Sequence, residues 1–326
     1  MTSSLLCESA VNLDFAIASN TRCGSTWLAT ALANTGSHVN VDWEVKLEGY
    51  VRSSVHYPIG ISDVPERLCV LAETLRKSNG KSYTSIGTKI TLDVSVEPFH
   101  TISVGDRWLA LERIRSSAPA MRFVHLTRGL CDQSQSPGGH STRRPGPETA
   151  SLLTEENRLL RNAVFEADCR PSADQPHIHR CDPQTVFHQF MNDVCLASAL
   201  SGDARYLLVK YEHLHTDFPA ILNFLDLPRE RSLDELSLTV KNSRSNLTTN
   251  CSLGSALTTL RDYLVGAIAM IASDDKSREI IVEGATQLYE SDCVRVLQAA
   301  RSADQASGRE LVHEIGRRLM WKLGFR

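Results

Sequence analysis

Residues 15–28 read FAIASNTRCGSTWL, and this stretch decides how the chain is expected to fold. A short apolar run, a turn of small residues and an apolar, Ala-rich segment form the pattern of a strand, a tight loop and a helix. The N–H groups of such a loop and of the helix N-terminus point at one place, where they favour an anion. Arg22 adds a charged, forked donor, and Ser25 and Thr26 add hydroxyl groups. The pattern therefore predicts a site for a phosphate or a sulfate ester.

The loop differs from the phosphate-binding loop of ATPases and GTPases. The first glycine of that motif is missing, and no lysine precedes the Ser25-Thr26 pair. The alternative interpretation of the stretch by itself is an ordinary strand-to-helix turn with a Ser/Thr cap.

A second segment, RFVHLTRGLCDQSQS at residues 122–136, makes an anion site the preferred interpretation. Its buried-strand pattern is followed at once by Arg128, and Ser136 lies eight positions later with Asp132 between them. Ligands of open α/β sheets bind at the carboxyl ends of the strands. We therefore expect Arg128 and Ser136 to hold one phosphate together.

These two segments, in this order, resemble those of the PAPS-dependent sulfotransferases, in the bacterial small-molecule branch that includes trehalose sulfotransferase. In that family the first loop holds the 5′-phosphosulfate of PAPS (3′-phosphoadenosine 5′-phosphosulfate) and the second segment holds its 3′-phosphate. The resemblance implies cofactor contacts for Arg22, Cys23, Gly24, Ser25, Thr26, Trp27, Arg128 and Ser136. Cys23 and Leu130 stand where the family has a serine and a proline, and neither departure removes a charge or a loop glycine.

Further stretches extend the resemblance to the catalytic residues. Residues 36–44 (GSHVNVDWE) look like the segment after the first helix of the family, in which the glutamate, here Glu44, is the general base. Residues 86–90 resemble a strand-end G-x-K, which implies that Lys89 lies near the transferred sulfuryl group. Arg244 stands where the family often adds a late phosphate contact.

The implied activity is transfer of the sulfuryl group from PAPS to a hydroxyl or nitrogen of a small molecule, leaving 3′,5′-adenosine bisphosphate. Arg22 and Lys89 suit the charge that develops on the leaving phosphate oxygen, and Glu44 suits the proton of a hydroxyl acceptor. The acceptor is expected to be a sugar or a secondary metabolite such as an alkaloid. The alternatives are a P-loop-type small-molecule kinase, or a catalytically inactive protein of the same fold that binds a nucleotide or a partner.

Strand-like and helix-like pieces alternate along the chain, which predicts an α/β fold with a mainly parallel sheet and helices on both faces. The resemblance narrows this to the P-loop-like sulfotransferase fold. The predicted strands are 13–19, 85–90, 121–127 and 206–210. The predicted helices are 25–35, 65–77, 105–117 and 184–200. The polar residues 41–63 are expected to form a substrate-facing loop.

Domain boundaries follow from the same patterns. Residues 1–250 are expected to form the sulfotransferase domain, with an irregular insert at 137–183 that begins with a Pro- and Gly-rich run. Residues 251–326 are expected to form a helical C-terminal extension packed on that domain. The insert holds four potential zinc ligands whose spacing fits no common site, so no metal is predicted; they are Cys169, His177, His179 and Cys181.

Composition restricts the partners. With a net charge of −3 the chain lacks the basic surface of a nucleic-acid-binding protein. Its nine cysteines, the absence of a signal-peptide pattern and apolar runs too short to span a bilayer predict a soluble cytoplasmic protein with free thiols. The expected partner is a small-molecule acceptor, and the resemblance also allows a homodimer.

Overall fold

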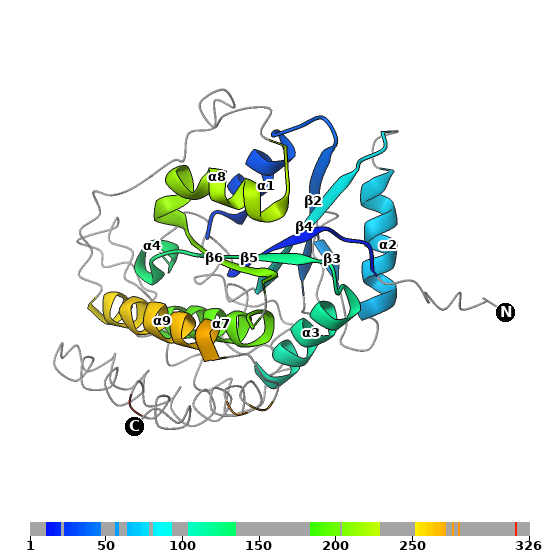
Figure 1. Cartoon of the computed structure of the whole chain (residues 1–326). Coiled ribbons are helices and arrows are strands. Elements are labelled where there is room, and N and C mark those ends of the chain that lie inside the picture. The colour runs from blue at the N-terminus through cyan, green and yellow to red at the C-terminus, as the bar shows by residue number, and fades with distance from the viewer. Residues whose placement is uncertain are drawn as a thin grey trace, which may run out of the picture.

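A six-stranded sheet in the order β3-β2-β4-β1-β5-β6, in which neighbouring strands run parallel, lies at the centre of the protein (Figure 1). The strands are β1 (Phe15–Asn20), β2 (Val39–Lys46), β3 (His56–Pro58), β4 (Ser85–Leu92), β5 (Arg122–Thr127) and β6 (Tyr206–Lys210). The computed structural model describes residues 11–20, 23–46, 56–58, 64–77, 81–92, 104–134, 183–202, 204–228 and 252–271, and the single residues 276, 280 and 317.

Helices cover both faces of this sheet. They are α1 (Ser25–Ala33), α2 (Val64–Arg76), α3 (Val104–Ser117), α4 (Leu130–Ser134), α7 (Pro183–Leu200), α8 (Leu214–Leu225) and α9 (Ser252–Ile271), with a short 3₁₀ helix, η3 (Tyr211–His213). Helices α1 and α8 pack on one face, and α2, α3 and α7 on the other (Figure 1). The predicted α/β sheet with helices on both faces is therefore confirmed.

The two apolar layers explain why β1 is an uninterrupted apolar run. Phe15 and Ile17 pack with α1 and α8, whereas Ala16 and Ala18 pack with the opposite helix layer. Because successive side chains of a strand point to opposite faces, a strand covered on both sides needs apolar residues at every position.

The eight strands and helices predicted above are confirmed to within two residues at either end. The prediction of a continuous loop over 41–63 is wrong, because β2 extends to Lys46 and β3 covers residues 56–58. Polar residues alternate with apolar ones along β2, and its pairing with β4 stabilises the strand without an apolar run to mark it.

Helix α9 is the described part of the expected C-terminal extension. It packs against α7 and α4, and Leu264 and Ile268 are buried there. The rest of 251–326, apart from three single residues, and the insert at 137–182 lie outside the described residues. Among the helices that the structure describes, none is long and apolar enough to cross a membrane.

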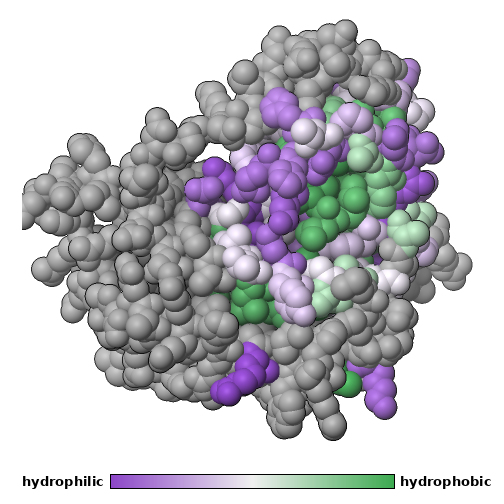
Figure 2. Space-filling view, turned by 60° about the vertical axis from the view of Figure 1, so that its left-hand side comes forward, coloured by the Kyte–Doolittle hydropathy of each residue, from purple (hydrophilic) through white to green (hydrophobic). Residues whose placement is uncertain are grey.

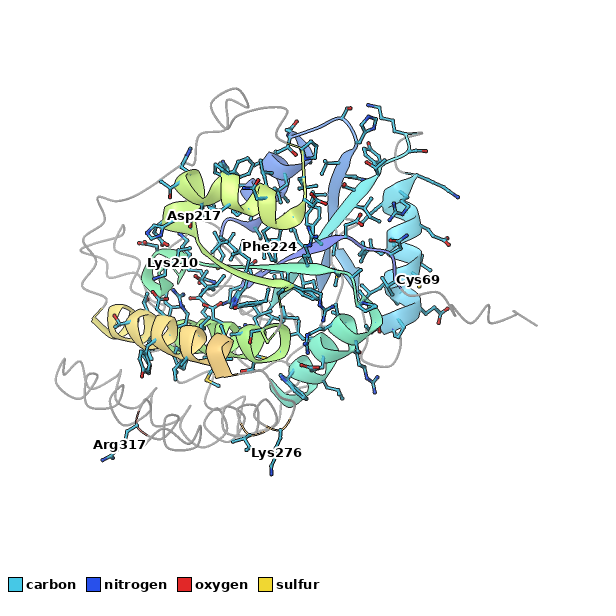
Figure 3. The ribbon with its side chains drawn as sticks, viewed as in Figure 1. Cys69, Lys210, Asp217, Phe224, Lys276 and Arg317 are labelled. Atoms are coloured by element: carbon cyan, nitrogen blue, oxygen red, sulfur yellow. The ribbon has the colours of Figure 1, made fainter. Side chains whose placement is uncertain are left out.

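The prediction that the cysteines are free thiols is confirmed only in part. Cys23 and Cys195 are buried free cysteines, as predicted. Cys69 on α2 (labelled in Figure 3) is disulfide-bonded, so the expectation of free thiols is wrong at this position.

Candidate anion site at the carboxyl edge of the sheet

The connections that leave β1 and β5 diverge, and this divergence positions the candidate site. From β1 the chain crosses one face of the sheet through α1 to β2, whereas from β5 it crosses the other face through α7 to β6. The carboxyl ends of β1 and β5 therefore form a topological switch point, where ligands of such sheets bind. The two segments singled out in the sequence run through these two strand ends: Cys23 lies three residues after the end of β1, and Arg128 follows β5 directly.

Gly24 forms the start of α1 and leaves the helix N-terminus open. Its backbone is left-handed, with φ 91° and ψ 13°, and its carbonyl accepts the first helical hydrogen bond from Leu28 N–H at 3.0 Å. No described side chain caps this helix, and its first turn holds no acidic residue. The N–H groups of Ser25 and Thr26 are thus presented to an anion, and the alternative of an ordinary Ser/Thr cap does not describe this turn.

The ring of Tyr211, in η3 after β6, joins the two segments. The guanidinium carbon of Arg128 lies 4.5 Å from the ring centroid, a cation–π contact. The same ring also lies against Gly24 of the first loop, where an added Cβ would collide with Cδ2 and Cε2 of Tyr211. Burial raises the pKa of the Tyr211 phenol, against the effect of Arg128, so the ring stays neutral at physiological pH. Arg128 and the first loop therefore lie on one side of the molecule, held by a shared aromatic ring.

Lys89 lies beside the start of α1, and Glu44 lies next to Lys89 on the adjacent strand. Lys89 Nζ donates to Thr26 Oγ1 at 3.4 Å. The lysine lies within β4, three residues before Leu92, so its expected strand-end position is wrong. Backbone register pairs Glu44 of β2 with Lys89, just after a shift in the register at Val41. Two of the three residues to which catalysis was assigned, Glu44 and Lys89, are thus neighbours on adjacent strands.

Cys23 belongs to the core although it lies in the loop between β1 and α1. Burial raises the pKa of its thiol well above the ordinary value and Asp193 raises it further, whereas Arg261 and Arg128 act in the opposite direction. A neutral, fully buried thiol offers an anion little, so a contact from Cys23 would come from its backbone. Trp27 is half-buried, with its ring 5.9 Å from that of His215.

Several predicted site residues, and the four residues of the insert that were considered as metal ligands and not assigned, lie outside the described part of the chain. These are Arg22, Ser136 and Arg244, the four potential zinc ligands of the insert, and the side chain of Glu44. Within the described ranges, no cluster of His, Cys, Asp and Glu could hold a metal ion.

A buried polar network next to the switch point was not predicted. Asp193 of α7 accepts hydrogen bonds from Asn20 Nδ2 at 2.5 Å and from Arg261 of α9 at 3.0 Å, and its Oδ1 lies 3.5 Å from Nε2 of His125. Arg261 also donates to the carbonyl of Arg128 at 2.6 Å. The only signal in the sequence is a set of polar residues within buried apolar runs, which does not say which of them meet.

Helix α9 and η3 fix the backbone that follows Arg128. Gly129 N–H donates to Glu212 Oε1 at 3.0 Å, and Leu130 N–H donates to Thr258 Oγ1 at 3.1 Å. Three consecutive residues after β5 are thus held by side chains from distant parts of the chain. The position of Arg128 is therefore set by tertiary contacts.

A charged chain continues from the network to the surface. Arg261 donates to Asp262 Oδ1 at 2.8 Å, and Lys210 (labelled in Figure 3) donates to Asp262 Oδ2 at 2.6 Å. Although burial alone would raise the pKa of the Asp262 carboxyl, these two hydrogen bonds hold it below its ordinary value. Asp262 is therefore an anion that helps to compensate the buried guanidinium.

Figure 2, turned so that the left-hand side of Figure 1 comes forward, shows hydrophilic residues next to an exposed hydrophobic area on the face that it draws. No family model matches the chain, and no curated protein matches it significantly. The fold defines the protein as a parallel α/β protein, with a candidate anion site at the switch point of its sheet.

Proposed function

We propose that this protein is a PAPS-dependent sulfotransferase that acts on a hydroxyl or nitrogen of a small molecule. The observation that carries the proposal is the meeting of Arg128 with the Gly24 turn through Tyr211 at the carboxyl edge of the sheet. PAPS carries phosphate groups on the 3′ and 5′ positions of its ribose. Two neighbouring positions that are cationic or rich in N–H groups can therefore bind the two ends of one PAPS molecule. The proposal includes the P-loop-like sulfotransferase fold and a helical C-terminal extension that begins with α9.

In this proposal the open N-terminus of α1, with Arg22, holds the 5′-phosphosulfate, and Arg128, with Ser136 and Arg244, holds the 3′-phosphate. The hydrogen-bond donors of the candidate site are cationic side chains and backbone N–H groups, and these suit the anionic groups of PAPS. PAPS supplies an activated sulfuryl group. Lys89, beside Thr26, faces the oxygen on which charge develops. Glu44 accepts the proton of the acceptor as the bond from the acceptor to sulfur forms and the bond between sulfur and the leaving phosphate oxygen breaks.

Calorimetry with 3′,5′-adenosine bisphosphate and with ATP tests the cofactor assignment. Tight binding of the bisphosphate and weak binding of ATP is expected, and the reverse preference would favour a kinase. Incubation with labelled PAPS and a panel of sugars and alkaloids then tests transfer, read as a mass gain of one sulfonate group. Binding without transfer to any acceptor would favour an inactive nucleotide-binding protein.

Arg128→Ala is expected to weaken binding of 3′,5′-adenosine bisphosphate by about 1.5–3 kcal/mol, because one charge-assisted contact is lost. Arg128→Lys should give an intermediate loss, since it keeps the charge but not the fork. Arg113→Ala on the exposed face of α3 is the matched control and should leave the affinity as it is. Unchanged affinity in Arg128→Ala would disprove the cofactor site.

Glu44→Gln is expected to lower turnover about 10²–10⁴-fold, the usual contribution of a general base, without changing cofactor affinity. Steady-state kinetics with saturating PAPS, together with calorimetry, separates the two quantities. Glu73→Gln on the exposed face of α2 removes the same charge far from the edge and serves as the control. If turnover of Glu44→Gln equals that of the control, another residue removes the proton.

A further inference from the structure

The Asp193–Arg261 pair touches both segments of the candidate site. Asp193 binds Asn20, the last residue of β1, directly before the first loop. Arg261 donates through its Nη1 both to Asp193 and to the carbonyl of Arg128. One carboxylate and one guanidinium nitrogen therefore connect the end of β1 to the start of the second segment.

The pair is also buried, with side-chain exposures of 0% for Asp193 and 2% for Arg261. A buried ion pair is costly to desolvate, and apolar residues of similar volume often stabilise a fold equally well. Burial opposes the charged state of Arg261, yet Asp193 and Asp262 raise its pKa above the ordinary value, so the guanidinium stays protonated. A charged pair at this position therefore suggests a role beyond stability.

The charge of the pair acts on the first loop. The Cys23 thiol is influenced by the Asp193 carboxylate and, in the opposite sense, by Arg261 and Arg128. An uncompensated carboxylate here would repel an anion bound at the start of α1. Arg261 compensates that charge while it holds the backbone of Arg128.

We propose that Asp193 and Arg261 are positioning residues that couple the two halves of the anion site, so that the geometry of the Gly24 turn depends on that of Arg128. The inference rests on the proposed function for the identity of the ligand, although the coupling itself is a property of the free protein. A coupling of this kind is reciprocal: disturbing either segment weakens binding at both.

Hydrogen exchange of the free protein tests the coupling without any ligand. Arg261→Lys keeps the charge and loses the fork, and Asp193→Asn replaces an acceptor oxygen with a donor. In both variants we expect exchange to become about tenfold faster in peptides covering 20–28 and 128–134, with 64–76 of α2 unaffected. Asp262→Asn, which removes a different partner of Arg261, should leave both segments nearly unchanged. Equal acceleration over all peptides would show a merely structural pair and overturn the proposal.

A double-mutant cycle on the affinity for 3′,5′-adenosine bisphosphate provides the second test. We expect Arg261→Lys to weaken binding about tenfold, and Arg128→Ala to cost less than about threefold more in that background. Strict additivity of the two losses would overturn the coupling. If the wild-type protein does not bind the bisphosphate, the proposed function fails, and the exchange measurement still decides the coupling.

Discussion

Arg261→Met is expected to lower the free energy of unfolding by about 3–5 kcal/mol, because it leaves the Asp193 carboxylate buried without its ionic partner. Such a loss is a large part of the roughly 5–15 kcal/mol by which a folded domain is stable. The carbonyl of Arg128 and the Asp262 carboxylate lose a donor in the same step. Urea unfolding followed by circular dichroism, with linear extrapolation, measures the change.

The double variant Asp193→Asn/Arg261→Met is the matched control, since it removes both charges from the buried site. Most of the lost stability should return, because no unpaired ion remains in the core. A loss below about 1 kcal/mol in Arg261→Met alone would mean that the ion pair is not buried as described.

Gly24→Ala is expected to destabilise the fold by at least about 2 kcal/mol and to weaken anion binding more than tenfold. Alanine pays about 1–2 kcal/mol for the left-handed backbone that Gly24 adopts. Its Cβ also meets the ring of Tyr211, which cannot move away without disturbing the guanidinium of Arg128. Unfolding experiments and calorimetry with 3′,5′-adenosine bisphosphate measure the two effects separately.

Gly266→Ala is the matched control for this substitution. Gly266 lies within α9, and an added Cβ there has no atom within 4 Å. Alanine is the better helix former by about 0.8–1.0 kcal/mol, so this variant should be as stable as the wild type or more stable. If Gly24→Ala behaved like Gly266→Ala, neither the left-handed turn nor the contact with Tyr211 would constrain the loop.

Local patterns predicted the parallel sheet, its helices and the strand ends at which the candidate site lies. Runs such as residues 15–18 are covered on both faces, and their apolar continuity marks them in the sequence. Strand β2 does carry a strand signal, because its polar and apolar residues alternate, but the polar content of 41–63 led to the prediction of a loop instead. The roles of Glu44 and Lys89 came from a family resemblance and stay predictions, although register makes the two residues neighbours.

The sequence by itself determined the glycine turn before α1 and the arginine directly after β5, because both follow from the residues within a few positions. Only the tertiary structure decided that Tyr211 stacks on Arg128 and that Asp193 pairs with Arg261. Arg261 binds partners 68 and 133 positions away in the chain. Contacts over such separations depend on how the helices pack on the sheet, and no local pattern of residues records that packing.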